Sequence, residues 1–408
     1  IVSSLTSVLD RKFQIFMSPS NIQDPSFSDS KRHYQILDGL RGVAAVMVVI
    51  YHIFATFSGG SHLKQIINHG YLAVDFFFAL SGFVIGYAYD DRWEKMSPKD
   101  FFKRRLLRLH PLIIVGMVLG AIGFYFSSSP ILFPQISSVP IWKMLLVMLI
   151  GFTLLPLPAS MDIRGWAEMH PLNGPAWSLL FEYVANILYA LFIRKFSNRL
   201  LSILVIMAAG FTIHFAVTSP HGDMTGGWSL ESSQIRIGLT RLLYPFLAGL
   251  LLSRIIKPGK IKNAFLWSSL MVVIILSFPR VGGSDSQWMN GLYESLSIIF
   301  LFPLIIYMGA SGEIKGKYVE KACKFLGDIS YPLYITHYPL IYIFVTWAID
   351  NKIPLKEAWP VGLLLLVSAI TIAYASFRFY DVPVRKWLTG RHKTRKSYTA
   401  QLETVNKG

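Results

Sequence analysis

The sequence has little charge and almost no cysteine. Charged residues make up 15% of its 408 positions and hydrophobic residues 53%, whereas soluble domains usually contain about 25% charged residues. The single cysteine, Cys323, excludes an internal disulfide and a cysteine-based metal cluster. These shortages exclude an ordinary soluble domain and indicate a membrane protein.

Acidic residues are scarcer than basic ones, with 23 Asp and Glu against 39 Lys and Arg. Such an excess can indicate nucleic-acid binding. Here, however, the basic residues form short clusters between apolar runs, as the positive-inside rule predicts for cytoplasmic loops. We therefore expect a lipid bilayer as partner and no nucleic acid. The clusters cover 92–108, 194–199, 254–262, 315–324 and 385–396.

Eleven apolar segments are candidates for membrane spans, which need about 20 residues each. They cover 40–57, 71–89, 106–126, 141–156, 176–193, 200–217, 237–256, 263–279, 291–310, 331–349 and 357–379. With every basic cluster in the cytoplasm, one segment between 108 and 194 cannot cross. The segment 141–156 is the shortest and ends in prolines, so we expect it to be re-entrant or interfacial. The prediction is an all-α polytopic fold with about ten transmembrane helices and both termini cytoplasmic.

The membrane domain is expected to cover 37–385. The polar residues before it, 1–36, predict a disordered extension without a cleavable signal peptide. Residues 1–16 precede the first methionine, Met17, and are expected to lie upstream of the true start. Residues 386–408 predict a basic cytoplasmic tail.

The first apolar segment, LDGLRGVAAVMVVIYH, contains Arg41 and His52. Eleven residues are almost three helical turns, so both side chains should project from one face, about 16 Å apart. An ionisable residue inside a membrane is costly and usually functional. Two simpler roles remain open: Arg41 could snorkel to the cytoplasmic boundary, and His52 could bond to the backbone near the outer interface.

Two carboxylates could orient this histidine. Asp75 opens the next segment at a depth comparable to that of His52, where a carboxylate would fix the imidazole tautomer. It could instead be a helix N-terminal charge. Glu182 lies about one turn into a later segment, with Trp177 as an interfacial anchor. Ser81 belongs to a small-residue spot that permits close helix packing.

Further polar residues flank later segments. Arg105 and Arg108, in KRRLLRLHP, share a helix face and could form a phosphate fork, or simply set the topology. His337 lies between Pro332 and Pro339. Because prolines leave backbone carbonyls free, His337 could have a structural role as well as a functional one.

In order, the motifs LDGLRG…YH, VDFFFALSGFVIGY, KRRLLRLHP, WSLLFEY and SYPLYITHYPL resemble those of the integral-membrane acyltransferase type-three family. The resemblance covers about residues 34–385. Its most specific marks are the arginine-x10-histidine pair and the arginine-x-x-arginine motif. Asp38 and Ser178 stand within the first and fourth motifs. His110 departs from the aromatic residue or isoleucine of many members.

The resemblance implies a stand-alone membrane O-acyltransferase, without the esterase-like domain that many members carry. Such enzymes move an acyl group, usually acetyl, from cytoplasmic acyl-CoA to a hydroxyl of an envelope or exported glycan. Some members use lipid-linked or small-molecule acceptors such as macrolides. A bacterial cytoplasmic (inner) membrane location follows, with polysaccharide-synthesis proteins as partners and no permanently bound cofactor.

Within that implied reaction, Arg41, Arg105 and Arg108 would bind the acyl-CoA donor and His52 would be the general base. Asp75 or Glu182 would orient the base. Direct transfer and a covalent acyl-histidine intermediate both remain open.

Two other classes of function use the same residues. The intramembrane charged groups could form the proton pathway of a transporter, or the chain could be a non-enzymatic assembly partner of a polysaccharide machine. A metal centre is not expected, because the loop histidines His62 and His69 lack a third ligand at suitable spacing.

Overall fold

A computed structural model describes residues 31–61 and 64–390. This part of the chain forms helices and no strand, which confirms the all-α prediction. The main helices are α2 (Gln35–Ala55), α3 (Ala73–Tyr89), α4 (Pro98–Gly123), α5 (Ile141–Phe152), α6 (Ala176–Leu191), α7 (Asn198–Thr218), α8 (Ser232–Ile255), α9 (Ala264–Ser277), α10 (Trp288–Leu296), α11 (Phe302–Ser311), α12 (Lys317–Thr336), α13 (Tyr338–Asp350) and α14 (Leu355–Ala375). His62, the N-terminal residues 1–30 and most of the predicted basic tail lie outside the described residues.

Seven of the described helices are long and apolar enough to cross a membrane, or eight if α12 and α13 form one broken span. Reaching the predicted ten would need α6 and α9, which have 16 and 14 residues. Both are shorter than the roughly 20 residues of a full crossing. The segment expected to be re-entrant forms α5, with 12 residues.

The segment 331–349 was predicted to be one span, and the structure shows that it is broken at His337. It contains the end of α12 and most of α13, which meet at an angle of 54° with His337 between them. Pro339 stands in the first turn of α13 and has no backbone N–H to continue the hydrogen bonding of α12. The break therefore leaves His337 at a helix junction inside the bundle.

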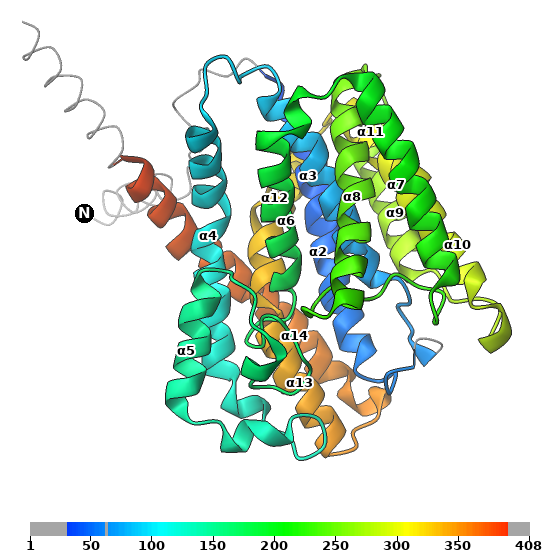
Figure 1. The fold of residues 1–408 in the computed structure, drawn as a ribbon. Coiled ribbons are helices and arrows are strands. Elements are labelled where there is room, and N and C mark those ends of the chain that lie inside the picture. Colours follow the sequence, from blue (N-terminus) through cyan, green and yellow to red (C-terminus); the bar gives the residue numbers. More distant parts are fainter. Residues whose placement is uncertain (1–30, 62–63, 391–408) are drawn as a thin grey trace, which may run out of the picture. The chain divides into compact units, whose positions relative to one another are not determined.

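Glycines allow the central helices to touch through their backbones. α2 and α3 lie in the middle of the bundle in Figure 1. A Cβ atom on Gly82 of α3 would lie 2.1 Å from the carbonyl oxygen of Phe246 in α8. A Cβ atom on Gly42 of α2 would lie 2.3 Å from the carbonyl oxygen of Leu326 in α12. Small residues thus set both interfaces, as in other membrane helices.

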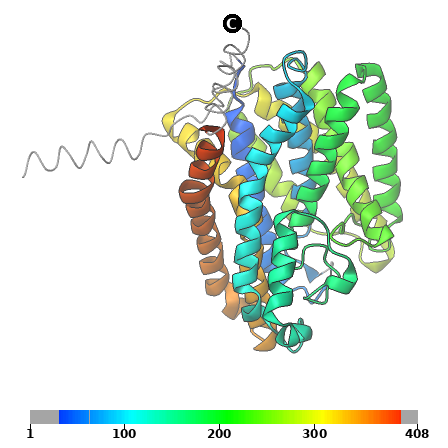
Figure 2. The ribbon, with the colours of Figure 1, turned by 60° about the vertical axis from the view of Figure 1, so that its left-hand side comes forward.

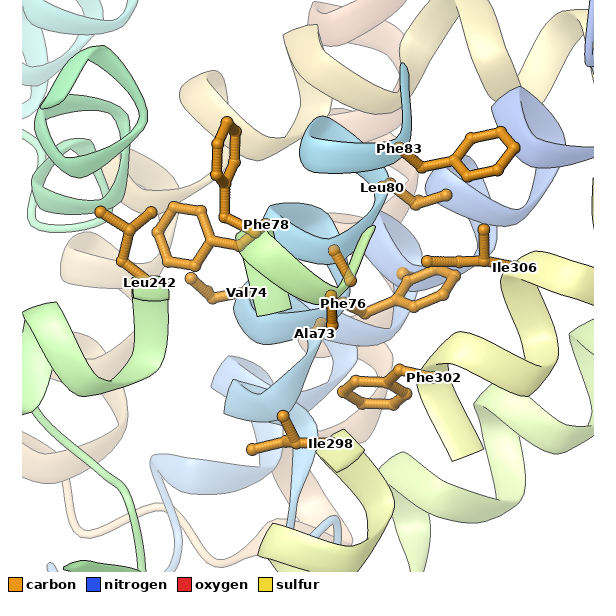
Figure 3. Packing of buried hydrophobic residues seen from close by; sticks show 14 of the residues in the cluster. Ala73, Val74, Phe76, Phe78, Leu80, Phe83, Leu242, Ile298, Phe302 and Ile306 are labelled. Atoms are coloured by element: carbon orange, nitrogen blue, oxygen red, sulfur yellow. The ribbon is translucent and has the colours of Figure 1, made fainter. Parts of the chain in front are cut away.

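The core around α3 combines phenylalanine rings with aliphatic side chains (Figure 3). Phe76 is 1% exposed and its ring centre lies 5.3 Å from that of Phe302. At the edge of the bundle, α14 runs into a π-helical segment, Ser376–Asp381, and the helix continues to Gly390, the last residue that the structure describes (Figure 2). The predicted start of the tail at residue 386 therefore lies within this helix.

Several basic loops meet at one end of the bundle. Arg254 Nε donates to Asp90 Oδ2 at 2.6 Å, and its Nη1 donates to the Phe196 carbonyl at 2.7 Å. In the loop after α8, Gly259 N donates to Ser311 Oγ at 3.0 Å. We call this the basic end. It is the end that the positive-inside rule predicts to face the cytoplasm.

Candidate functional site

The first helix, α2, presents Arg41 and His52 to α12 and the junction that follows it. Arg41 Nε donates to Ser330 Oγ at 3.0 Å, and Arg41 Nη2 donates to Asp38 Oδ1 at 2.5 Å. Eleven residues further along α2, the His52 ring stacks on His337, with 5.5 Å between ring centres and 28° between planes. The structure thus places Arg41 and His52 along one side of α2, as the helical period predicts.

Three aromatic rings surround His52. Its ring centre lies 4.9 Å from that of Tyr51 and 4.8 Å from that of Tyr338, both in edge-on contacts. His337 completes this wall. We call His52 and His337 the imidazole pair. His52 is partly accessible, while His337 is 0% exposed.

Asp75 does not contact the imidazole pair through any hydrogen bond in the described structure. Its carboxylate accepts from Arg241 Nη2 at 2.7 Å and from Arg241 Nε at 3.2 Å. The arginine also donates to the backbone oxygens of Tyr71 and Gly226. A carboxylate buried at 0% exposure needs a cation, and Arg241 of α8 supplies it. Asp75 is therefore bound to Arg241, and no direct contact supports its predicted role in orienting His52.

Glu182 is likewise bound elsewhere. It accepts from Arg105 Nη2 at 2.5 Å and from Ser81 Oγ at 3.0 Å. This carboxylate thus neutralises an arginine of α4, and no hydrogen bond in the described structure joins it to His52.

Two residues predicted near Glu182 also have internal roles. Trp177 was expected to be an interfacial anchor, but it is buried, and the Arg241 guanidinium lies 5.2 Å from its ring. Ser178 Oγ shares a hydrogen bond of 2.7 Å with Tyr334 Oη. Both residues therefore pack inside the bundle, between α6 and its neighbours.

The predicted arginines gather in the half of the bundle toward the basic end. Arg108 experiences the charges of Arg41 and Arg385, and Arg385 is ion-paired with Asp381 of the last helix. The Nε atoms of Arg105 and Arg385 are buried without a hydrogen-bond partner among the described residues. We call Arg41, Arg105, Arg108 and Arg385 the arginine group. Its unused donors suit an anionic ligand.

A second buried network was missed from the sequence. His69, expected to be an ordinary loop histidine, is 0% exposed, and its Nδ1 lies 3.0 Å from Glu294 Oε1. The Tyr71 hydroxyl donates to the same oxygen, and Arg280 lies 3.6 Å from it. The signal was present, because Glu294 interrupts an apolar run and an acidic residue there needs a partner.

The irregular loop between α5 and α6 contributes two further ionisable side chains, which both contact Tyr342. Glu168 Oε2 accepts from the Tyr342 hydroxyl at 2.5 Å, and burial raises the pKa of this carboxyl to about 7. The guanidinium of Arg164 lies 3.5 Å from the centre of the Tyr342 ring. The Tyr342 and Tyr338 ring centres are 4.6 Å apart, so a line of rings connects Glu168 to His52.

Comparison with known proteins identifies a family and several relatives. The family described as "Acyltransferase domain" matches residues 34–378. O-acetyltransferase OatA of Staphylococcus aureus (strain NCTC 8325 / PS 47) is 26% identical over 380 residues, which cover 88% of this chain and 58% of the relative. A protein provisionally named O-acetyltransferase SAR0937, from strain MRSA252 of the same species, is 27% identical over 398 residues, covering 91% and 60%.

The chain spans somewhat more than half the length of the curated relatives it matches. No solved structure matches it. The family match nevertheless runs from the start of α2 into the π-helical segment after α14, and it contains the imidazole pair and three of the four arginines of the arginine group. The chain therefore belongs to the acyltransferase domain family that its motifs resemble, and it is a multi-pass membrane protein.

Proposed function

We propose that this protein is a membrane O-acetyltransferase that moves an acetyl group from acyl-CoA to a hydroxyl of an envelope or exported glycan. The observation that carries the proposal is the imidazole pair, which lies on the same side of α2 as Arg41 and has no carboxylate partner in the described structure. Its family and the O-acetyltransferase names of its relatives support the reaction class.

The arginine group would bind the donor. Coenzyme A carries several phosphates, and guanidinium groups bind phosphate through paired, charge-assisted hydrogen bonds. Arg41 and His52 are about 16 Å apart along the helix, of the order of the arm that joins those phosphates to the thioester. A donor held at the basic end could therefore present its acyl group to His52.

His52 would act as the general base. It would remove the proton of the acceptor hydroxyl while the oxygen attacks the thioester carbonyl. The new C–O bond forms, the C–S bond breaks, and the proton passes to the departing thiolate, giving an ester and free coenzyme A. Imidazole suits this role near neutral pH. Because no carboxylate of the described residues hydrogen-bonds to His52, the rings of Tyr51, His337 and Tyr338 would hold it in place.

The location follows from the same chemistry. Acyl-CoA is cytoplasmic and exported glycans lie on the other side, so we place the protein in the bacterial cytoplasmic membrane with the basic end inside. Proteins of glycan synthesis would deliver the acceptor.

The test is acceptor-dependent release of free thiol. Purified protein in lipid nanodiscs is given acetyl-CoA and a panel of glycan oligosaccharides, and coenzyme A is detected with a thiol reagent. We expect release in wild type and a loss of about 10²–10⁴-fold in His52→Ala, with the variant still folded. Proton flux without thiol release would indicate a transporter. Full activity in His52→Ala would exclude this residue as the base.

A further inference from the structure

The buried imidazole of His337 has one ring nitrogen in use and one free. Its Nδ1 lies 3.0 Å from the Leu333 carbonyl oxygen and 2.9 Å from that of Tyr334. Carbonyl oxygens only accept hydrogen bonds, so Nδ1 carries the proton and Nε2 has a lone pair. That Nε2 atom has no partner among the described residues.

A buried acceptor without a partner is uncommon and calls for an explanation. His337 is 0% exposed, so bulk water does not satisfy it. Because Nδ1 points back at the last turn of α12, the opposite edge of the ring, with Nε2, points away from that helix. The α12–α13 break places the face of this ring against His52, the proposed base.

The two imidazoles cannot satisfy each other. Their planes are 28° apart and their centres are separated by 5.5 Å, so the rings are stacked. Hydrogen bonds to ring nitrogens lie near the ring plane, and a stacked partner is out of reach. Each imidazole therefore has a nitrogen for a third molecule. One hydroxyl of that molecule goes to His52 in the proposed reaction, and His337 Nε2 needs a second donor group.

We propose that His337 Nε2 accepts a hydrogen bond from a second hydroxyl of the acceptor, adjacent to the hydroxyl that is acylated. The site would then select vicinal diols, as found in sugar rings, over isolated hydroxyls. This inference rests on the proposed O-acetyltransferase function. His337 is an acceptor-binding residue in it, and the proton transfer stays with His52.

Two substitutions of His337 distinguish the role of Nδ1 from that of Nε2. In His337→Asn the side-chain amide nitrogen can replace Nδ1 and keep the bonds to Leu333 and Tyr334, while the acceptor at Nε2 is lost. In His337→Gln the longer side chain can place an oxygen near the Nε2 position. We expect His337→Asn to raise the acceptor KM roughly 10-fold, as for one lost hydrogen bond, with the acetyl-CoA KM unchanged. His337→Gln should restore much of the acceptor affinity.

A deoxy acceptor that lacks the neighbouring hydroxyl provides the second measurement. Wild type should bind it as weakly as His337→Asn binds the diol, and His337→Asn should show no further loss, because both changes remove the same bond. Equal KM values for diol and deoxy acceptors in wild type would overturn the proposal. So would a loss in His337→Asn that is the same for both acceptors, since this is what a structural role predicts.

The outcomes also separate this inference from the function on which it rests. If wild type releases no thiol with any glycan, the O-acetyltransferase proposal fails and this one fails with it. If wild type releases thiol but does not distinguish diol from deoxy acceptors, only the role of His337 fails. Because that comparison needs no variant, it decides the matter even if His337→Asn does not fold.

Discussion

The Asp75–Arg241 pair and the imidazole pair are both ionisable and lie inside the bundle, yet their hydrogen bonding is opposite. Asp75 accepts two N–H groups of Arg241, and the arginine gives two further donors to the backbone oxygens of Tyr71 and Gly226. In the imidazole pair, His337 Nε2 is unpartnered and His52 forms no hydrogen bond to a carboxylate among the described residues.

This difference in hydrogen bonding distinguishes ionisable groups with a structural role from those that can bind a ligand. A buried charge whose partners are complete joins helices and has nothing left for a ligand. A buried polar group whose partners are incomplete carries a cost that a substrate can remove. The two regions are also neighbours, since Tyr51 lies between them, 5.8 Å from Tyr71 and 4.9 Å from His52 in ring-centre distance. The region of the Asp75–Arg241 pair therefore supports Tyr51, which packs against His52.

The largest effect on stability should come from breaking the Asp75–Arg241 pair. Asp75→Ala leaves the charge of Arg241 buried without compensation, and we expect the free energy of unfolding to fall by about 3–5 kcal/mol. Thermal unfolding in detergent measures this. His52→Ala is the control, because it breaks no ion pair and should unfold near the wild-type temperature. Should Asp75→Ala stay stable and lose transferase activity instead, Asp75 belongs to the chemistry after all.

Glu168 is intermediate between the fully paired Asp75 and the unpartnered His337, because it has a partner but that partner is the neutral Tyr342 hydroxyl. Burial raises its pKa from 4.5 to about 7, so between these values the folded chain holds a proton that the unfolded chain has released. The free energy of unfolding therefore decreases as the pH rises from 4.5 to 7, by at most about 3 kcal/mol. Glu168→Gln should remove this slope in unfolding measured across that range. An unchanged slope in the variant would assign the pH dependence to another group.

Much of the helical arrangement could be predicted from the sequence, because it follows from local properties. Apolar run length placed the spans, and helical period placed Arg41 and His52 on one side of α2. The break at His337 was not predicted, although Pro332 and Pro339 flank it. Proline inside a membrane helix is compatible with a kink or a full break, and packing against α2 and α14 decides between them.

The partners of the carboxylates could not be predicted. Asp75 and Arg241 are 166 positions apart, and sequence distance says nothing about which of several intramembrane cations a carboxylate meets. We expected Asp75 to contact His52 because the two residues have a similar predicted depth in the membrane. Depth fixes one coordinate of three, and the direction in which a helix face points is set by its neighbours. Arg241 was visible in an apolar run and should have been considered as a partner.

The arginine group offers a comparison between paired and free guanidinium donors. Arg105 gives one donor to Glu182 and keeps a buried Nε unpartnered. If that group binds the phosphates of coenzyme A, Arg105→Ala should weaken acetyl-CoA binding by about 1.5–3 kcal/mol, measured by calorimetry. Glu182→Gln retains the arginine and should keep most of the affinity. Unchanged donor affinity together with an altered membrane topology would mean that the basic cluster only orients the chain.

The smallest effect should come from a residue that only positions an arginine. Ser330 Oγ accepts from Arg41 Nε at 3.0 Å and donates to the Gly327 carbonyl at 2.8 Å. Ser330→Ala removes one neutral partner of Arg41, which keeps its contact with Asp38, so donor binding should weaken by only about 0.5–1.5 kcal/mol. Thr371→Ala is a matched control, because Thr371 is exposed and its hydroxyl bonds, among the described residues, only to the Val367 carbonyl of its own helix. A loss in Ser330→Ala as large as that in Arg105→Ala would show that the direction of the Arg41 guanidinium, and not the number of positive charges, limits donor binding.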